Sequence, residues 1–167
     1  MGPGAAFFHP VSARKTLVEG PFSALLVMAS GASGGKLSLV EHPLAPRALG
    51  SPMHTHSHED EYSYILAGQI GAHVGEEVIL AGPGDVIAKP SGIPHAFWNA
   101  GNEPARVLEI IAPGGFEDYF AALGELLATG APPDPDARQA LGERFGLDLD
   151  AGSIPRLAAE HGLRPGS

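Results

Sequence analysis

Short apolar or alternating runs, each bounded by Gly or Pro, follow one another along most of the chain. Runs of this length and pattern are typical of strands, and their close spacing favours a β-rich fold. Gly75-Glu76 separates two of them and fits a hairpin turn, because Gly comes first as a type II′ turn requires. The predicted strands are residues 22–29, 36–42, 61–67, 69–74, 77–80, 85–89, 95–99 and 105–113.

The periodicity becomes helical in the last third of the chain. An apolar residue recurs at i, i+4, i+7 and i+11, which predicts an amphipathic helix. These positions are Phe116, Phe120, Leu123 and Leu127. Asp134 and Pro135 predict the start of a second helix, and Gly146 predicts its end. A third short helix is expected over residues 154–162, and the segment 129–136 is interpreted as a hinge.

Composition narrows the classes of protein that the chain can belong to. Hydrophobic residues make up 44% and charged residues 17% of 167 residues, so one domain with a sizeable core is expected. The 23 Gly and 16 Pro have no fixed period, which excludes collagen. A net charge of −9 argues against a protein that binds nucleic acid or an anionic membrane through electrostatic attraction. The lack of cysteine excludes disulfides, zinc fingers, iron–sulfur clusters and thiol nucleophiles, so a metal would need nitrogen and oxygen ligands.

The apolar segments also bear on where the protein works. The first 20 residues have no continuous apolar stretch, so we expect no signal peptide. The longest apolar stretch, within residues 22–32, is too short to span a bilayer. We therefore expect a cytoplasmic protein without a membrane partner.

The stretch SPMHTHSHEDEYSYILAG concentrates histidines and acids. His54 and His56 are two residues apart, which on a strand places both imidazoles on one face, about 7 Å apart along the backbone. Glu61 follows after room for a bend, and His95 comes much later, after a turn. Three imidazoles and one carboxylate form a mixed site for a first-row divalent metal. His58 repeats the same spacing after His56 and remains an alternative ligand, because its chemistry also permits binding.

The remaining ionisable neighbours receive simpler interpretations. Glu59 and Asp60 are expected to be solvated or to orient a ligand imidazole. Four other histidines are interpreted as ordinary surface or core residues. They are His9, His42, His73 and His161.

Two longer spacing patterns surround the candidate ligands. Downstream, the pattern G-x5-P-x-G-x2-H-x3-N would arise by chance in roughly one such sequence in ten thousand. Its positions are Gly84, Pro90, Gly92, His95 and Asn99. Upstream, the spacing resembles the first motif of the cupin superfamily, roughly G-x5-H-x-H-x3,4-E-x6-G, and the downstream pattern resembles the second. The first motif is matched at His54, His56, Glu61 and Gly68, but its leading glycine would fall at Ala48.

The resemblance covers roughly residues 20–115 and implies an all-β fold. This fold is the cupin double-stranded β-helix, or jelly-roll barrel, with a C-terminal helical tail. It implies that residues 1–113 form the barrel with its N-terminal strands and that residues 114–167 form a helical extension packed on it. It also implies a homodimer and one divalent transition metal inside the barrel, held by the four motif ligands. The sequence does not choose among Fe, Ni, Co, Mn, Zn and Cu.

Strand alternation predicts which neighbours face the barrel interior. With Glu61 pointing inward, Ser63 and Ile65 also point inward, and Phe97 shares the face of His95. We expect the substrate pocket to be lined by Ser63, Ile65, Val86, Ala88 and Phe97. For the last four, a place in the hydrophobic core is the commoner role of such residues and remains the alternative. The remaining motif residues are expected to shape the backbone. They are Gly68, Gly84, Pro90, Gly92 and Asn99.

The charge of the site suggests its chemistry. A divalent ion with one ionised Glu61 has a net charge of about +1, which favours an anionic ligand such as an enolate in a low-dielectric pocket. The tail is similar to that of single-domain cupins such as bacterial quercetin 2,3-dioxygenases. This resemblance implies a dioxygenase that uses O2 on an enolisable, flavonol-like small molecule, with Glu61 as general base. The alternatives are a non-redox metal-dependent isomerase or cyclase and a non-catalytic small-molecule-binding cupin.

Overall fold

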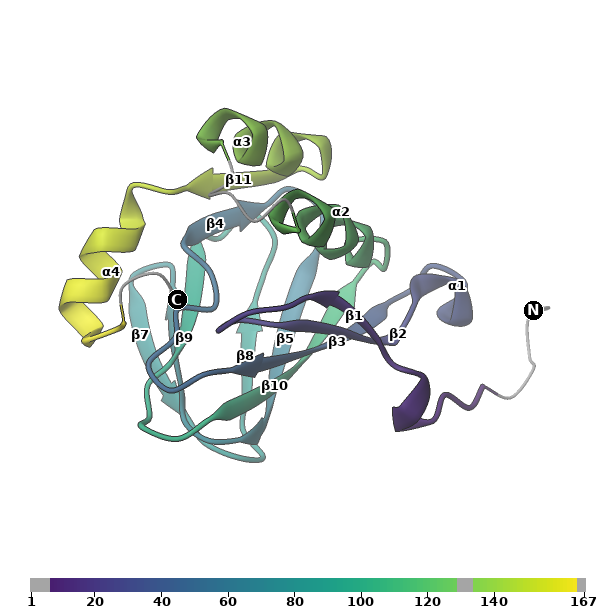
Figure 1. The fold of residues 1–167 in the computed structure, drawn as a ribbon, viewed down its shortest axis with the longest axis horizontal. Helices are drawn as coiled ribbons and strands as arrows, with labels where there is room; N and C mark the ends of the chain where they lie inside the picture. The colour runs from purple at the N-terminus through teal and green to yellow at the C-terminus, as the bar shows by residue number, and fades with distance from the viewer. Residues whose placement is uncertain (1–6, 129–133, 165–167) are drawn as a thin grey trace.

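Two antiparallel sheets dominate the computed structural model, which describes residues 7–128 and 134–164 (Figure 1). In spatial order, the first sheet contains β1 (Lys15–Val18), β2 (Ala24–Met28), β3 (Ser38–Leu44), β10 (Ala105–Ala112), β5 (Asp60–Ala67) and β8 (Val86–Lys89). The second contains β11 (Leu147–Asp150), β4 (Met53–His56), β9 (His95–Asn99), β6 (Ile70–Val74) and β7 (Glu77–Ala81). Two packed antiparallel sheets fit the all-β prediction of a cupin β-sandwich.

Helices are a smaller part of the fold. They are η1 (Val11–Ala13), α1 (Ser30–Ser33), α2 (Glu117–Leu127), α3 (Pro135–Arg144) and α4 (Ser153–His161). The three predicted helices are thus confirmed, and the Asp134 side chain accepts a hydrogen bond from the backbone of Asp136 at the start of α3. Residues 129–133 of the predicted hinge lie outside the described residues. None of the described helices is long and apolar enough to cross a membrane.

The eight predicted strands all form, with bounds that differ by at most two residues. β4 also forms, as the expected spacing of its histidines requires. β1 and β11 were not predicted. β11 follows two helices, and its alternating Leu and Asp residues form a strand because β4 offers them a partner edge: Leu147 lies opposite His56 and Leu149 opposite His54. The segment after residue 113 therefore contributes a strand beside the histidine-bearing strand, in addition to helices.

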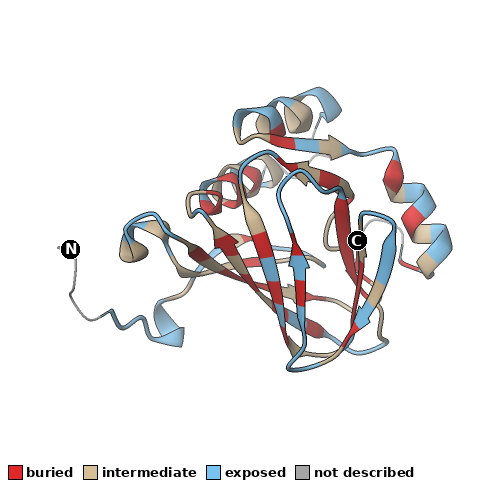
Figure 2. Ribbon diagram, turned by 180° about the vertical axis from the view of Figure 1, so that it is seen from behind, coloured by how far each residue is buried: buried red, intermediate tan, exposed pale blue. Residues whose placement is uncertain are grey.

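The core between the sheets comes from alternate positions on the strands, which appear as alternating buried and exposed residues in Figure 2. Its largest members are Leu44, Ile65, Ile70, Ile87 and Phe97. A second cluster packs α2 against the first sheet and β11. It includes Val40, Ile111, Phe116, Phe120 and Leu147. α2 thus covers the end of the barrel where the histidine-bearing strand lies.

Candidate metal centre

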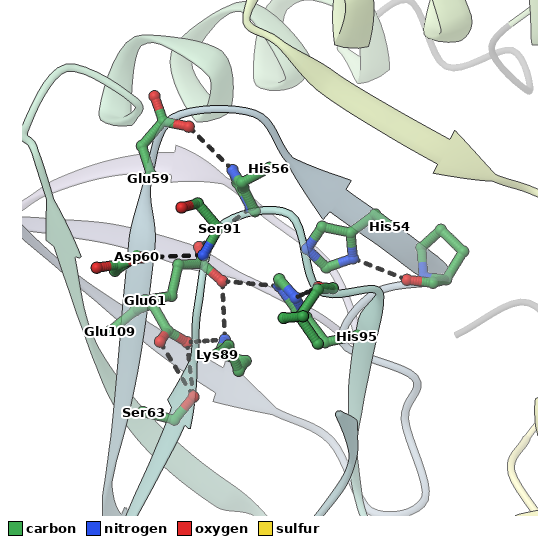
Figure 3. A network of polar contacts seen from close by, with 12 residues as sticks. His54, His56, Glu59, Asp60, Glu61, Ser63, Lys89, Ser91, His95 and Glu109 are labelled. Atoms are coloured by element: carbon green, nitrogen blue, oxygen red, sulfur yellow. Dashed lines mark hydrogen bonds and ion pairs between the residues drawn. The ribbon is translucent and has the colours of Figure 1, made fainter. Parts of the chain in front are cut away.

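Four side chains from three strands converge inside the barrel (Figure 3). β4 carries His54 and His56, β5 carries Glu61 and β9 carries His95. Strand pairing brings them together because His54 lies directly opposite His95. One ligand atom of each residue lies within 4.8 Å of those of the others, and all four residues are buried. The residues that the spacing predicted as ligands form one cluster, and this cluster could hold a metal ion.

Backbone carbonyls orient two of the imidazoles. His54 Nδ1 lies 2.9 Å from the Pro52 oxygen, and His95 Nδ1 lies 2.9 Å from the Ile93 oxygen. A carbonyl can only accept, so each Nδ1 carries the proton and each Nε2 presents a lone pair in the neutral ring. Burial lowers the pKa of His54 well below its usual range, and the neighbouring His95 adds to this shift. The His54 ring is therefore held in its neutral, metal-binding form, and the Nδ1 contact of His95 turns its Nε2 toward the cluster.

The third imidazole tests whether a metal fits the site. His56 Nδ1 lies 3.3 Å from the Glu59 carboxylate, which fixes the ring from outside the cluster. His56 Nε2 is buried and has no hydrogen-bond partner in the described part of the chain. A buried polar atom without a partner is costly, and a metal ion at the centre of the cluster would satisfy it. The donor set of three nitrogens and one carboxylate suits a first-row divalent ion.

A buried lysine adds a charge that the sequence analysis did not assign to the site. Lys89 Nζ lies 2.9 Å from Glu61 Oε2 and 2.9 Å from Glu109 Oε2, and Ser63 Oγ donates to both Glu109 oxygens at 3.0 Å (Figure 3). Burial opposes ionisation of Glu61, but Lys89 and the nearby histidines hold its pKa well below its usual range. Burial raises the pKa of Glu109, while the two carboxylates raise the pKa of Lys89 despite its burial. Glu61 is thus held ionised beside a second, more basic carboxylate.

The sequence contains a pattern from which the Lys89–Glu109 ion pair could have been predicted. Each is the only charged residue in an otherwise apolar stretch, VIAK in β8 and VLEIIA in β10. Both strands pair with β5, which carries Glu61. Opposite lone charges on the two neighbours of a ligand strand would have indicated an internal ion pair, because buried charges need partners.

The prediction for the pocket residues on β8 is wrong, because the opposite face of this strand points into the barrel. Val86 is 59% exposed and Ala88 is also exposed, so neither lines the barrel interior. Ile87 and Lys89 are buried instead, and Lys89 lies opposite Glu61 in the β5–β8 pair. The apolar character of the strand does not distinguish its two faces. The buried ion pair of Lys89 decides which face of β8 points inward.

The other predicted pocket residues do face inward. Ser63, Ile65 and Phe97 are buried, and Phe97 lies under the Lys89 ammonium with 4.9 Å from Nζ to the ring centre. The Ser63 hydroxyl donates a hydrogen bond to Glu109. It therefore belongs to the polar network next to the ligands.

His42 lies in the barrel interior, although the sequence offered no partner for it. Its ring stacks on Phe22 at 4.8 Å between centroids and lies 5.0 Å from Phe120 and 6.0 Å from Phe97. Nδ1 donates to the Ser23 carbonyl at 3.0 Å. Burial lowers the pKa of His42 to about 4, so the ring is neutral at physiological pH. The interior thus has an aromatic wall with one neutral imidazole.

His58 lies outside the metal cluster. The residue is exposed and its ring rests against the backbone of Gly146, where an added Cβ would come within 2.8 Å of His58 Nδ1. Asp60 also points away from the imidazoles and accepts a hydrogen bond from the Ser91 backbone at 2.9 Å. Of the two acids considered as orienting groups, only Glu59 contacts a ligand imidazole.

The remaining motif residues lie in turns and at loop contacts. Gly84 and Gly92 take the third position of turns 82–85 and 90–93 with φ of 94° and 75°, which side-chain-bearing residues rarely adopt. Pro90 opens the second turn, and Gly68 joins β5 to β6. Asn99 is buried and ties together the loops at the other end of the barrel. Its side chain bonds to Leu44, Ala45, Gly101 and Glu103.

Comparison with known proteins agrees with this geometry. Residues 41–111 match the family model of the cupin domain, whereas no curated protein matches the sequence. The solved structure of TT1209 from Thermus thermophilus is 29% identical, with a TM-score of 0.50 over 55% of this chain and 83% of that one. A predicted oxalate decarboxylase from Thermotoga maritima is 24% identical, with a TM-score of 0.54 over 60% and 91%. A sugar phosphate isomerase of the cupin superfamily from Silicibacter pomeroyi is 22% identical, with a TM-score of 0.53 over 62% and 73%. The cupin-domain match and these cupin-fold structures support placing the chain in the cupin superfamily.

Proposed function

We propose that the protein is a metal-dependent dioxygenase that acts on an enolisable, flavonol-like aromatic molecule. The observation that carries the proposal is the convergence of three oriented imidazoles and one ionised carboxylate in a buried site. His54, His56, Glu61 and His95 would hold the ion. Four protein ligands leave one or two positions open on a five- or six-coordinate ion. A bound divalent ion would supply a positive centre for an anionic substrate oxygen and, if redox-active, a means of reaction with O2.

The charges around the site support an anionic substrate. Glu61 and Glu109 carry at most two negative charges, and Lys89 carries one positive charge. Together with a divalent ion, these groups leave the interior positive. A positive centre in a low-dielectric barrel favours an enolate over its neutral form.

The same residues can accept the proton that the substrate loses. In the proposal Glu61 accepts it, and Lys89 keeps this carboxylate ionised and ready to do so. Glu109, whose pKa is raised, lies on the other side of Lys89 and is better matched to hold a proton near neutral pH. The aromatic wall formed by Phe22, Phe97 and His42 would orient a flat ring beside the ligands.

The Lys89–Glu109 pair also favours a second candidate, a non-redox isomerase or cyclase. An ammonium and a basic carboxylate 2.9 Å apart can give and take protons without O2. In both candidates the protein is expected to work as a homodimer in the cytoplasm.

Oxygen uptake distinguishes the candidates. Untagged protein is stripped of metal, reloaded separately with Fe, Ni, Co, Mn, Cu or Zn, and given a panel of flavonols and smaller enolisable aromatics. We expect substrate-dependent O2 consumption with at least one redox-active metal. The His95→Ala variant should lose at least about 100-fold of both metal affinity and activity, whereas His58→Ala should match the wild type.

The other outcomes are equally informative. Turnover under argon or with Zn alone would favour the isomerase or cyclase. Saturable binding without chemical change in any metal state would favour a small-molecule binder. A fully metallated and equally active His95→Ala variant would exclude the proposed site.

A further inference from the structure

A second group of potential ligands lies outside the barrel. His73 from β6 and the pair Glu160 and His161 from the end of α4 each have a ligand atom within 4.8 Å of those of the other two. We propose that these three residues bind a second divalent metal ion of the zinc type, which fastens α4 to the second sheet. This proposal does not depend on the function proposed for the barrel site.

The His161 ring is already positioned for this role. It stacks on Trp98 with 4.0 Å between centroids and 16° between planes, and the His73 ring lies 6.0 Å away. The His161 side chain is only 15% exposed, and its Nε2 has no hydrogen-bond partner within residues 7–128 and 134–164. A shielded nitrogen without a partner is unfavourable unless something binds it.

The carboxylate completes the donor set. Glu160 Oε1 lies 4.0 Å from His161 Nε2, and the Glu160 side chain is 47% exposed, so it can move toward the ion. Its present partner is Arg156 at 3.7 Å, an exposed ion pair of little energetic weight. Two imidazoles and one carboxylate are common zinc ligands. In a tetrahedral site the ligand atoms lie about 3.4 Å apart, so small side-chain rotations close the cluster.

The surroundings of the site show how an ion can reach it and what its binding would stabilise. His161 and Trp98 line an open groove of about 330 Å³ on the barrel surface, through which an ion can reach the His161 ring. Three protein ligands leave the fourth position to water. α4 otherwise rests on a small apolar cluster that includes Trp98, Leu157 and Leu163. An ion bound only in the folded state would stabilise this attachment by mass action.

Trp98 makes the site directly observable. It is the only tryptophan in the chain and is in ring contact with His161. Untagged protein stripped with a chelator is titrated with Zn²⁺ to count ions per chain by equilibrium dialysis, and with Ni²⁺ to follow quenching of Trp98 fluorescence. We expect two Zn²⁺ per chain in the wild type. His73→Gln and Glu160→Gln should each weaken binding at the outer site at least about tenfold and leave the barrel site intact.

Two further variants separate the sites. His54→Gln should lose the barrel ion but retain one Zn²⁺ and the Ni²⁺ quenching of Trp98. His58→Gln, which changes an exposed histidine elsewhere, should behave as the wild type in both titrations. Circular dichroism confirms that each variant is folded, and Glu160→Gln, at an exposed position, remains informative should His73→Gln misfold.

Three results would overturn the proposal. The first is a wild-type protein whose single Zn²⁺ per chain is lost in His54→Gln. The second is a second ion that His73→Gln and Glu160→Gln leave unaffected. The third is Ni²⁺ quenching of Trp98 that survives in both variants. His54→Gln reports the barrel ion separately from the outer ion, so failure here and failure of the dioxygenase proposal are distinguishable.

Discussion

The inner and outer clusters use the same residue types but hold them differently. In the inner cluster, Nδ1 of every imidazole has an acceptor, and Lys89 holds the ligand carboxylate. In the outer cluster, His161 is positioned by stacking on Trp98, and Glu160 is half-exposed beside Arg156. The inner ligands come from strands that hydrogen-bond to one another within one sheet or pack face to face, whereas the outer ligands join a strand to a helix. The inner cluster is therefore more preorganised than the outer one, and preorganisation raises metal affinity and fixes the ligand geometry.

The largest expected effect comes from removing the buried lysine. Lys89→Met should lower the free energy of unfolding of metal-free protein by about 3–5 kcal/mol, because it leaves buried carboxylates without their cation. Added metal should restore part of this loss by neutralising Glu61. Denaturant unfolding measures both quantities. Arg106→Met, which removes a half-exposed partner of Glu41, is the matched control and should cost less than about 1 kcal/mol. Equal losses in the two variants would mean that the barrel interior is hydrated.

The second prediction concerns the pH dependence of the free energy of unfolding, which reports whether the barrel interior is hydrated. His42 has a pKa of about 4 in the folded protein and about 6.5 when unfolded. The unfolded chain therefore takes up a proton first, and stability that is complete above pH 6.5 is lost as the pH falls toward 4. The loss amounts to about 3 kcal/mol.

Measuring unfolding free energies at pH 7 and pH 4 isolates this contribution. In His42→Gln the difference between the two pH values should shrink by about 3 kcal/mol, since the titrating group is gone. Replacing the exposed His58 by Gln should leave the difference unchanged. A pH dependence identical in wild type and His42→Gln would show that this imidazole is hydrated.

The smallest effect concerns the orientation of one ligand. Glu59→Ala should weaken metal binding in the barrel about tenfold, because it removes the carboxylate that faces His56 Nδ1 at 3.3 Å. Competition with a chelator of known affinity measures the change. Asp60→Asn is the control, since Asp60 bonds to the Ser91 backbone and not to an imidazole. Unchanged affinity in Glu59→Ala would mean that the acceptor beside His56 Nδ1 adds nothing to the preorganisation of the inner cluster.

Much of the barrel could be predicted because its signals are local. Strand positions follow from short apolar runs between Gly and Pro, and the turns that need a left-handed residue carry Gly84 and Gly92. The inner ligands could also be predicted, because alternation puts His54 and His56 on one face and the motif spacing adds Glu61 and His95. β11 could not be predicted in the same way, since its two leucines form a strand only where β4 provides an edge.

Local sequence patterns specify most of the strands and the residues that can meet at the inner site. Both depend on side-chain period and turn chemistry within a few residues. Only the tertiary structure decided that Lys89 turns inward to join Glu61 and Glu109, and that His73 meets His161. These contacts join segments 20 to 88 positions apart in the chain. The face that an apolar strand buries, and the partner that a helix end finds, are set by packing energy summed over the whole fold, which no local pattern records.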